Sequence, residues 1–406
     1  MLKLKDYIKE EKNVHMEHLE DLIFNEGVDG TRKAINFLQD LRDMLAGHSS
    51  AKMTASVKWD GAPAIFAGTD PRDGKFFVAK KGIFNKNPKI YKTPREIDAD
   101  VSGDLADKFK VALSEFKKLN IKGIIQGDLL FTNDLKIETI EGKKYVTFHP
   151  NTIVYAVPYE DSETLRKAKI GVVWHTTYSG SSFETLTASF GKPIVPKLTK
   201  SASVWMDDAT YKDVSGTATF TAAETKHLTS ILSEAGKLLQ SIPSKVINDI
   251  TNDAELLLLV KTYNNSKVRA GEKITDPAKH ATGLFHYIYD KYQKEIDTKK
   301  TDKSKQQWKE KKDKILSYFT ENDRSDIANV FKLSNLLVDA KHMIVDKMNN
   351  AGHINTFLKT TNGFKTTGVE GFVAIDHIKG GAVKLVNRME FSKANFSADI
   401  LKGWQR

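Results

Sequence analysis

The 406-residue sequence contains no cysteine and no long apolar segment. Without cysteine the chain can form no disulfide framework, no thiolate nucleophile and no zinc site of the thiolate type. No stretch approaches the ~18 consecutive apolar residues that a membrane helix needs. The amino-terminal residues also lack the apolar core of a secretory signal peptide. These absences predict a cytoplasmic protein with no membrane association.

The sequence has an excess of basic residues. It contains 62 lysines and arginines against 52 acidic residues, which gives a formal net charge of +10. A basic balance of this size favours a polyanionic partner, most often nucleic acid. Charge alone does not distinguish an enzyme from a protein that only binds its partner.

The spacing of apolar residues divides the chain into four parts. Helical periodicity covers 1–50, with a break at Gly27 and Gly30. Short strands separated by Gly, Pro and Asp turns dominate 51–220, among them one over Lys136–Ile140. From 221 to 359 the helical pattern returns, starting at a capping box formed by Thr221 and Glu224. We expect it to break near Pro243, Asn264–Gly271, Pro277 and Asn322. Strands resume over 360–406. We therefore expect an α+β fold with antiparallel sheets, interrupted by a helical insertion and completed at the end of the chain.

Two charged features of the helical regions have open interpretations. Asp297–Lys314 contains eight lysines and four acidic residues around Trp308. Such a run is typical of a solvated helix face, but it would also suit a surface that follows phosphates. His15 and His18 lie three apart on an expected helix, where a metal site would still need a third ligand.

One short stretch, Ala55-Ser-Val-Lys-Trp-Asp-Gly-Ala-Pro-Ala64, places a lysine at the end of an apolar strand. A lysine that attacks a phosphate must be neutral, whereas a free lysine titrates near ~10.4, so burial or a second cation has to favour the amine. Gly61 would let the backbone approach a nucleotide closely. The alternative is an ordinary turn between two strands. Partners elsewhere in the chain must decide between the two interpretations.

Five further segments resemble, in order and residue type, the motifs of the covalent nucleotidyltransferase superfamily, which contains ATP-dependent DNA ligases, RNA ligases and mRNA capping enzymes. With the Lys58 segment as motif I, they correspond to motifs Ia, III, IIIa, IV and V. They are Val78-Ala-Lys-Lys-Gly82, Ile125-Gln-Gly-Asp-Leu-Leu130, Ile170-Gly-Val-Val-Trp-His175, Val369-Glu-Gly-Phe-Val373 and Ala382-Val-Lys-Leu-Val386. The nearest likeness is to phage RNA ligases that seal nicks in duplex RNA.

The resemblance implies a role for each residue of the first two motifs. Lys58 would attack the α-phosphate of ATP and carry AMP on its side-chain nitrogen. Asp60 and Gly61 would complete motif I and contact the nucleotide. Lys80 and Lys81 would bind phosphate of the nucleotide or of the strand end. Each of these residues could also be an ordinary part of a turn.

The later motifs would supply the metal site and the rest of the nucleotide site. Asp128 would contact ribose or metal, Glu370 would bind the divalent metal, and Lys384 would act with Lys58 by holding the α-phosphate. Asp60, Asp128 and Glu370 would together hold Mg²⁺ or Mn²⁺, because Mg²⁺ favours few carboxylates plus phosphate oxygens. Trp174 would cover the adenine, although core packing explains a strand tryptophan equally well. Taken singly, these segments also suit a plain turn or solvated strand residues.

Three departures from the family pattern make the chain a divergent candidate. Pro63 stands where DNA ligases and capping enzymes have an arginine, and Asp128 replaces a glutamate. Val386 replaces the second lysine of motif V, for which Arg388 could substitute. The chain also ends soon after motif V, so we expect no carboxyl-terminal OB domain.

The sequence therefore predicts an antiparallel-sheet nucleotidyltransferase domain, of the ATP-grasp-like ligase type, in an ATP-dependent polynucleotide ligase. Its partner would be nucleic acid with 5′-phosphate and 3′-hydroxyl ends, and the family likeness favours RNA over DNA. The helical segment 221–359 would bind the nucleic acid. Two alternatives stay open: a GTP-dependent capping-type guanylyltransferase, and a basic nucleic-acid-binding protein with a degenerate ligase fold.

Overall fold

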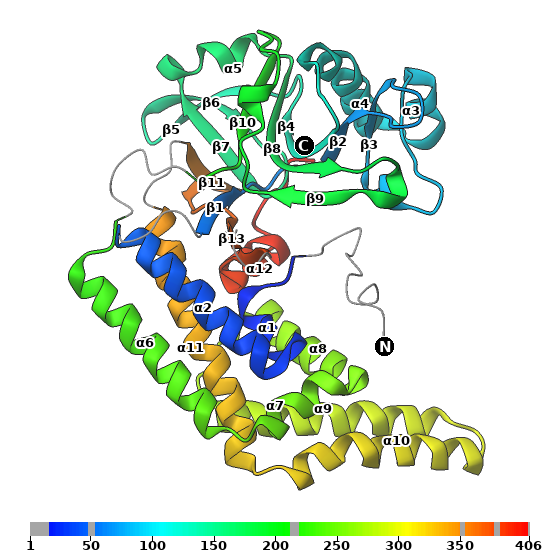
Figure 1. Ribbon diagram of the computed structural model, residues 1–406, viewed down its shortest axis with the longest axis vertical. Helices are drawn as coiled ribbons and strands as arrows, with labels where there is room; N and C mark the ends of the chain where they lie inside the picture. Colours follow the sequence, from blue (N-terminus) through cyan, green and yellow to red (C-terminus); the bar gives the residue numbers. More distant parts are fainter. Residues whose placement is uncertain (1–15, 48–52, 212–218, 350–353, 377–381, 405–406) are drawn as a thin grey trace, which may run out of the picture.

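The computed structural model describes residues 16–47, 53–211, 219–349, 354–376 and 382–404. Figure 1 shows a strand-rich unit above a helical unit, with the chain passing between them several times. The architecture is mixed α and β, and most strand pairs are antiparallel, as the sequence predicts. In the described ranges no helix is long and apolar enough to cross a membrane.

A small three-stranded sheet joins the beginning of the strand-rich unit to its end. Strand β1 (Met53–Lys58) pairs antiparallel with β13 (Gly371–Asp376), which pairs antiparallel with β14 (Ala382–Leu385). Lys58 lies opposite Gly371, and Lys384 lies opposite Val373. The sheet thus brings segments from before and after the long helices into direct contact.

The largest sheet has the order β10-β8-β4-β2-β3, with β9 paired to β8. Its strands are β2 (Ala64–Thr69), β3 (Phe76–Ala79), β4 (Ile124–Phe131), β8 (Ile170–Ser179), β9 (Thr187–Phe190) and β10 (Val204–Asp208). All pairs are antiparallel except β10 with β8. Helix α4 (Gly103–Phe116) packs on one face, where Phe109 and Phe116 join the core. The short helices α3 (Pro94–Asp100) and α5 (Glu163–Lys167) complete this unit.

A third sheet has the order β12-β11-β7-β6-β5. It contains β5 (Lys136–Ile140), β6 (Lys143–Phe148), β7 (Ile153–Pro158), β11 (Asn355–Thr360) and β12 (Gly363–Thr366). Because β11 pairs with β7, the strand-rich unit resumes at Asn355 rather than at residue 360. The sequence pattern did not predict β11 or β12.

The helical unit contains the amino-terminal helices and the helices that follow residue 221. Its elements are α1 (Leu22–Asn25), α2 (Gly27–Leu45), α6 (Ala222–Ser241), α7 (Ser244–Asn252), α8 (Ala254–Ala270), α9 (Pro277–Thr298), α10 (Asp302–Glu321) and α11 (Arg324–Asn349). The capping box at Thr221 and Glu224 begins α6 as predicted. Helix α2 packs against α6, α7 and α11, so the amino-terminal segment belongs to this unit. In Figure 1 the α9–α10 hairpin is the part farthest from the sheets.

The sequence predicts helices in the amino-terminal segment with a break at Gly27 and Gly30, and the structure places this break at Gly27, where α2 begins. His18 is extended and precedes a short 3-10 turn at Leu19–Asp21, whereas His15 lies outside the described residues. Gly30 lies inside α2, where an added Cβ would be 2.1 Å from the Leu22 carbonyl oxygen. The glycine therefore allows α1 and α2 to pack closely and does not break the helix.

A buried charge network fixes this segment between the two units. Lys341 of α11 donates hydrogen bonds of 2.9 Å to both carboxylate oxygens of Glu20. Arg388, at the start of α12 (Arg388–Phe396), donates one of 2.9 Å to Asp21. Lys341 is 1% exposed, so the loss of one partner would leave an uncompensated buried charge. Through Arg388 the network fixes the start of α12 against the amino-terminal segment.

Candidate active site

Lys58 and Glu370 meet where β1 pairs with β13. Glu370 comes directly before β13, and its Oε2 forms an ion pair with Lys58 Nζ. The two side chains are 27% exposed for Lys58 and 10% exposed for Glu370. The two motif residues that lie near opposite ends of the sequence are therefore direct neighbours in the fold.

A second carboxyl group, that of Asp128 on β4, faces the same lysine. Burial raises the pKa of Asp128 to about 7, Lys58 opposes this rise, and Asp60 adds to it. Burial likewise raises the pKa of Glu370 to about 7, again against the effect of Lys58. Asp128 contributes to the rise at Glu370, so the two carboxyl groups influence each other. The carboxyl groups of Asp128 and Glu370 thus both interact with the amine of Lys58.

Lys384 on β14 supplies a second amine to this cluster. Burial lowers the pKa of Lys384, and the positive charge of Lys58 lowers it further, whereas Glu370 and Glu17 oppose the change. The backbone of Lys384 is fixed separately, since its N–H donates to the Glu17 carbonyl at 2.9 Å. Motif residues Lys58, Asp128, Glu370 and Lys384 are therefore gathered at one place.

Asp60 has a structural role that the motif assignment did not predict. Asn151 Nδ2, Thr152 N and Ile153 N donate hydrogen bonds of 2.7, 2.7 and 2.9 Å to its carboxylate. Its own N–H donates to the Tyr155 hydroxyl at 2.8 Å. Because these contacts engage both oxygens and the side chain is 4% exposed, Asp60 fixes the turn after Lys58 to the start of β7 and presents little of its carboxylate to a metal or nucleotide.

Gly61 is required by the closeness of β4. A Cβ at this position would be 2.5 Å from Asp128 Cβ and 3.0 Å from the Leu129 carbonyl oxygen. Both contacts are shorter than packed carbon atoms tolerate. The glycine thus keeps Asp128 beside the lysine turn.

The lysine pair of the second motif divides between two surroundings. Lys80 forms an ion pair of 3.0 Å with Asp100, and its Nζ lies 6.0 Å from the centre of the Tyr91 ring. Lys81 is exposed, and its charge acts on both Asp128 and Lys384. Of the two predicted phosphate ligands, only Lys81 lies on the side of the candidate site.

Trp174 does not reach the site and cannot cover a base there. Its side chain is 1% exposed and packs edge to face on Phe116, with 5.1 Å between ring centres. The side chain that does face Lys58 is the next one, His175, whose Nε2 is 3.9 Å from Asp128 Oδ2. Burial, with a smaller effect from Lys58, lowers the pKa of His175 to about 4. His175 therefore offers a neutral imidazole, and motif matching missed it.

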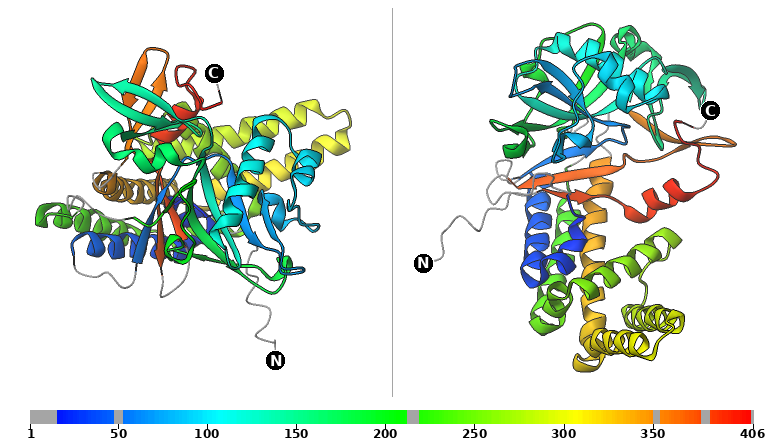
Figure 2. Two further views of the ribbon diagram at one scale, coloured as in Figure 1. Left: turned by 90° about the horizontal axis from the view of Figure 1, so that it is seen from above. Right: turned by 90° about the vertical axis from the view of Figure 1, so that its right-hand side faces the viewer.

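A cleft of about 350 Å³ opens in front of this cluster. Lys58, Glu370 and Lys384 line one side, while His18, α8 and α12 provide the rest of the lining. Figures 1 and 2 show α12 between the strand-rich unit and α8, which puts the helical unit at the edge of the site. Arg388 also lines the cleft, but its guanidinium is bound to Asp21 and Asn265. It therefore anchors α12 instead of replacing the second lysine of motif V.

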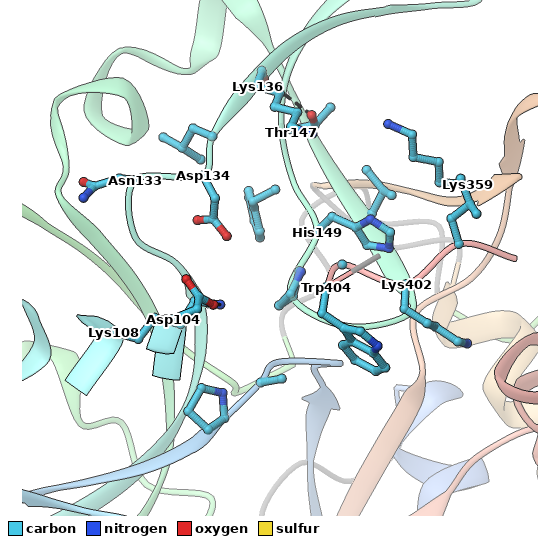
Figure 3. Close-up of a pocket in the computed structure, with 18 of the residues that line it drawn as sticks. Asp104, Lys108, Asn133, Asp134, Lys136, Thr147, His149, Lys359, Lys402 and Trp404 are labelled. Carbon is cyan, nitrogen blue, oxygen red and sulfur yellow. Dashed lines mark hydrogen bonds and ion pairs between the residues drawn. The ribbon is translucent and has the colours of Figure 1, made fainter. Parts of the chain in front are cut away.

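A larger cavity of about 700 Å³ lies elsewhere in the strand-rich unit. Figure 3 shows Asp104 and Asp134 on one side of it and His149, Lys402 and Trp404 on the other. Pro63 belongs to its wall, but the motif residues Lys58, Glu370 and Lys384 do not. The larger cavity is therefore separate from the cluster of motif residues.

The carboxyl groups near Lys58 can be compared with the ligands that the expected Mg²⁺ ion prefers. Within the described residues no group of three or more histidines and carboxylates could hold a metal ion. Asp128 and Glu370 nevertheless share one site, and both have raised pKa values because they are buried carboxyl groups. Mg²⁺ commonly binds one or two carboxylates and completes its shell with water and substrate phosphate. These two residues fit such an ion, whereas Asp60 does not.

Comparisons with known proteins add little beyond this geometry. No curated protein and no solved structure matches the chain. One protein-family model matches residues 13–400, and its description is "Family of unknown function (DUF6267)".

Proposed function

The chain belongs to the DUF6267 family of unknown function, and we propose from its own site that it is an ATP-dependent polynucleotide ligase. One observation carries the proposal: Lys58, Asp128, Glu370 and Lys384 come from four separate segments and interact in one cluster, and Lys58, Glu370 and Lys384 line the same cleft. These are the residues that resemble the reactive motifs of covalent nucleotidyltransferases. Their clustering is what that chemistry requires.

The first step would be transfer of AMP from ATP to Lys58. The neutral Nζ attacks the α-phosphorus, an N–P bond forms, and the bond to the bridging oxygen breaks to release pyrophosphate. The nitrogen becomes positively charged as the N–P bond forms, and it then releases one proton to solvent. Lys384 places a second amine beside Lys58. The same side chain stabilises negative charge that develops on the transferred phosphate.

Asp128 and Glu370 would hold a divalent ion, Mg²⁺ or Mn²⁺, next to Lys58. Such an ion supplies charge neutralisation at the phosphate oxygens. Glu370 also orients Lys58 through their ion pair, and His175 supports Asp128 from the neighbouring strand. Burial of the cluster strengthens each of these electrostatic effects, because little water screens them.

Two further steps would complete the reaction. The 5′-phosphate of a nucleic-acid strand attacks the lysyl-AMP phosphorus, and Lys58 leaves as the amine. The 3′-hydroxyl of an adjoining strand then attacks the activated 5′-phosphorus and displaces AMP. The net charge of +10 favours such a polyanionic substrate. The resemblance to phage RNA ligases favours RNA over DNA as the substrate strand.

Incubation of the purified protein with α-labelled ATP and a divalent metal ion tests the proposal. A covalent, Mg²⁺-dependent adduct is expected with ATP and not with GTP. An adduct with GTP instead would favour the capping-type alternative. A protein that binds nucleic acid but forms no adduct with either nucleotide would favour the degenerate fold.

A further inference from the structure

One wall of the cleft that Lys58 lines carries an exposed aromatic ring beside an exposed cation. Phe396, in the last turn of α12, is 70% exposed. Arg269, in the last turn of α8, places its guanidinium carbon 5.9 Å from the centre of the Phe396 ring. Both residues line the same cleft as Lys58 and Lys384. Neither takes part in the adenylation step described above.

The exposure of Phe396 is unusual for this protein. It is the most exposed large hydrophobic side chain in the described part of the chain. Its neighbour Ala394 is buried, so α12 is seated on the protein while its end presents the phenyl ring to the cleft. An exposed aromatic ring flanked by arginine is a surface on which a nucleobase can stack.

The charges of the wall also suit a phosphate. No acidic side chain of the described ranges forms an ion pair with Arg269, whereas Arg388 is neutralised by Asp21 and Glu20. Glu370 is the acidic residue among those lining the cleft, and it pairs with Lys58. Arg269 is thus a cation available to a ligand that enters the cleft. Guanidinium groups bind phosphate through two parallel hydrogen bonds.

We propose that this wall binds the 5′-phosphorylated end of a single nucleic-acid strand. Arg269 contacts the terminal phosphate, and Phe396 stacks on the first base. The choice of a 5′-phosphate rests on the proposed ligase function, because that group must reach the AMP on Lys58. The wall lies next to Lys58, whereas the lysines of α10 lie on the hairpin far from the sheets (Figure 1). The end of the strand is therefore recognised by α8 and α12.

Fluorescence anisotropy without ATP tests this site, using a short RNA oligonucleotide labelled at its 3′ end. The strand is prepared with a 5′-phosphate and with a 5′-hydroxyl, and the wild type is expected to bind the phosphorylated form more tightly. Phe396→Ala should weaken binding of both strands by about fivefold or more, since stacking on one aromatic ring is worth ~1–3 kcal/mol. Phe396→Tyr should restore it. Arg269→Gln should weaken binding of the phosphorylated strand alone.

Two matched variants control for the loss of an exposed side chain. Trp404→Ala removes an aromatic ring that is 66% exposed outside the cleft, and Arg324→Gln removes an exposed arginine at the far end of the helical unit. Both should bind RNA as the wild type does. All variants should keep the wild-type unfolding midpoint, and Trp404→Ala and Arg324→Gln should also keep the wild-type rate of adduct formation on Lys58.

The outcomes separate this inference from the ligase proposal. Equal binding of the two strands by the wild type, or wild-type affinity in both Phe396→Ala and Arg269→Gln, would overturn the strand-end site even if the lysyl adduct forms. If the strand preference and its loss are observed but no adduct forms, the strand-end site stands and the ligase function is overturned.

Discussion

Lys58 Nζ and Glu370 Oε2 form an ion pair that joins the start of the strand-rich unit to its return after the helices. The pairing of β1 with β13 produces this contact, since Lys58 lies opposite Gly371, the residue after Glu370. The side chain of Glu370 is 10% exposed, so the interaction is weakly screened by water. The long helical segment therefore separates the two residues in sequence without separating them in space.

Replacement of Glu370 by glutamine should slow adduct formation on Lys58 by ~100-fold or more, because one preorganised group at a reacting phosphate is worth about that much. The fold should be unaffected, since Lys58 keeps contact with water. The rate is measured with labelled ATP, and the unfolding midpoint is measured in parallel. Glu390→Gln changes an exposed carboxylate on α12 and serves as the matched control. A wild-type rate in Glu370→Gln would contradict the assignment.

The raised pKa of Asp128 predicts a pH-dependent effect on stability. The folded protein keeps a proton on this carboxyl group up to about pH 7, whereas the unfolded chain releases it near 3.8. The folded state binds more protons in this range, so Asp128 lowers the free energy of unfolding as the pH rises from 3.8 to about 7. Asp128→Asn removes this contribution.

The stability of Asp128→Asn relative to wild type should therefore increase with pH, by at most ~1.4 kcal/mol per pH unit. Urea unfolding without divalent metal, at several pH values between about 4 and 7, measures the difference. Asp399→Asn, which changes an exposed carboxyl group, should show no such trend. A constant difference between Asp128→Asn and wild type would show that burial does not shift the pKa of Asp128.

Replacement of Gly61 by alanine should destabilise the protein by ~1–3 kcal/mol, because a methyl group is forced into packed structure. The added Cβ would meet Asp128 Cβ at 2.5 Å. The displacement of Asp128 should also slow adduct formation. Gly236→Ala is the control, because nothing lies within 4 Å of its added Cβ in the middle of α6. That substitution should stabilise the protein by ~0.5–1 kcal/mol. Equal stability of Gly61→Ala and wild type would contradict the close packing.

The neighbouring residues Trp174 and His175 should have separable effects. Trp174→Leu should lower the unfolding midpoint, since a large core side chain is lost, and leave the KM for ATP unchanged. His175→Ala should slow adduct formation, because Asp128 loses its neighbour in the site. Thermal unfolding and adduct kinetics on both variants provide the test. A raised KM in Trp174→Leu would restore Trp174 as the residue that covers the base.

Sequence periodicity predicted much of the strand-rich unit because its strands are bounded by clear turn residues. Strand β5 was predicted with its observed bounds, and α9 begins at the predicted proline, Pro277. The breaks near Pro243 and Asn322 are also confirmed. The break expected over Asn264–Gly271 falls at the end of that range, since α8 ends at Ala270. The short elements β11, β12 and α12 were missed. Short segments carry too few residues to establish a period.

Local sequence patterns indicate which residues stand at the end of a strand, such as Lys58 at the end of β1, but not the distant contacts that their side chains make. The partners of Asp60 come from the start of β7, which no local pattern reveals. The faces of Trp174 and His175 depend on a bulge: Gln126 pairs with Thr176 and Gly127 with Trp174, so His175 is the extra residue. Alternation along β8 does not reveal the direction of the His175 side chain, because Val172, Val173 and Trp174 are consecutive buried apolar residues.

The most direct test of the account is the location of the nucleotide adduct. The wild-type protein is incubated with ATP and Mg²⁺, digested, and its peptides are analysed by mass spectrometry. The account predicts an AMP group on Lys58 Nζ and its absence from Lys58→Ala protein treated in the same way. An adduct on another residue, or no adduct on the wild type, would contradict the claim that Lys58 is the nucleophile of a covalent nucleotidyltransferase.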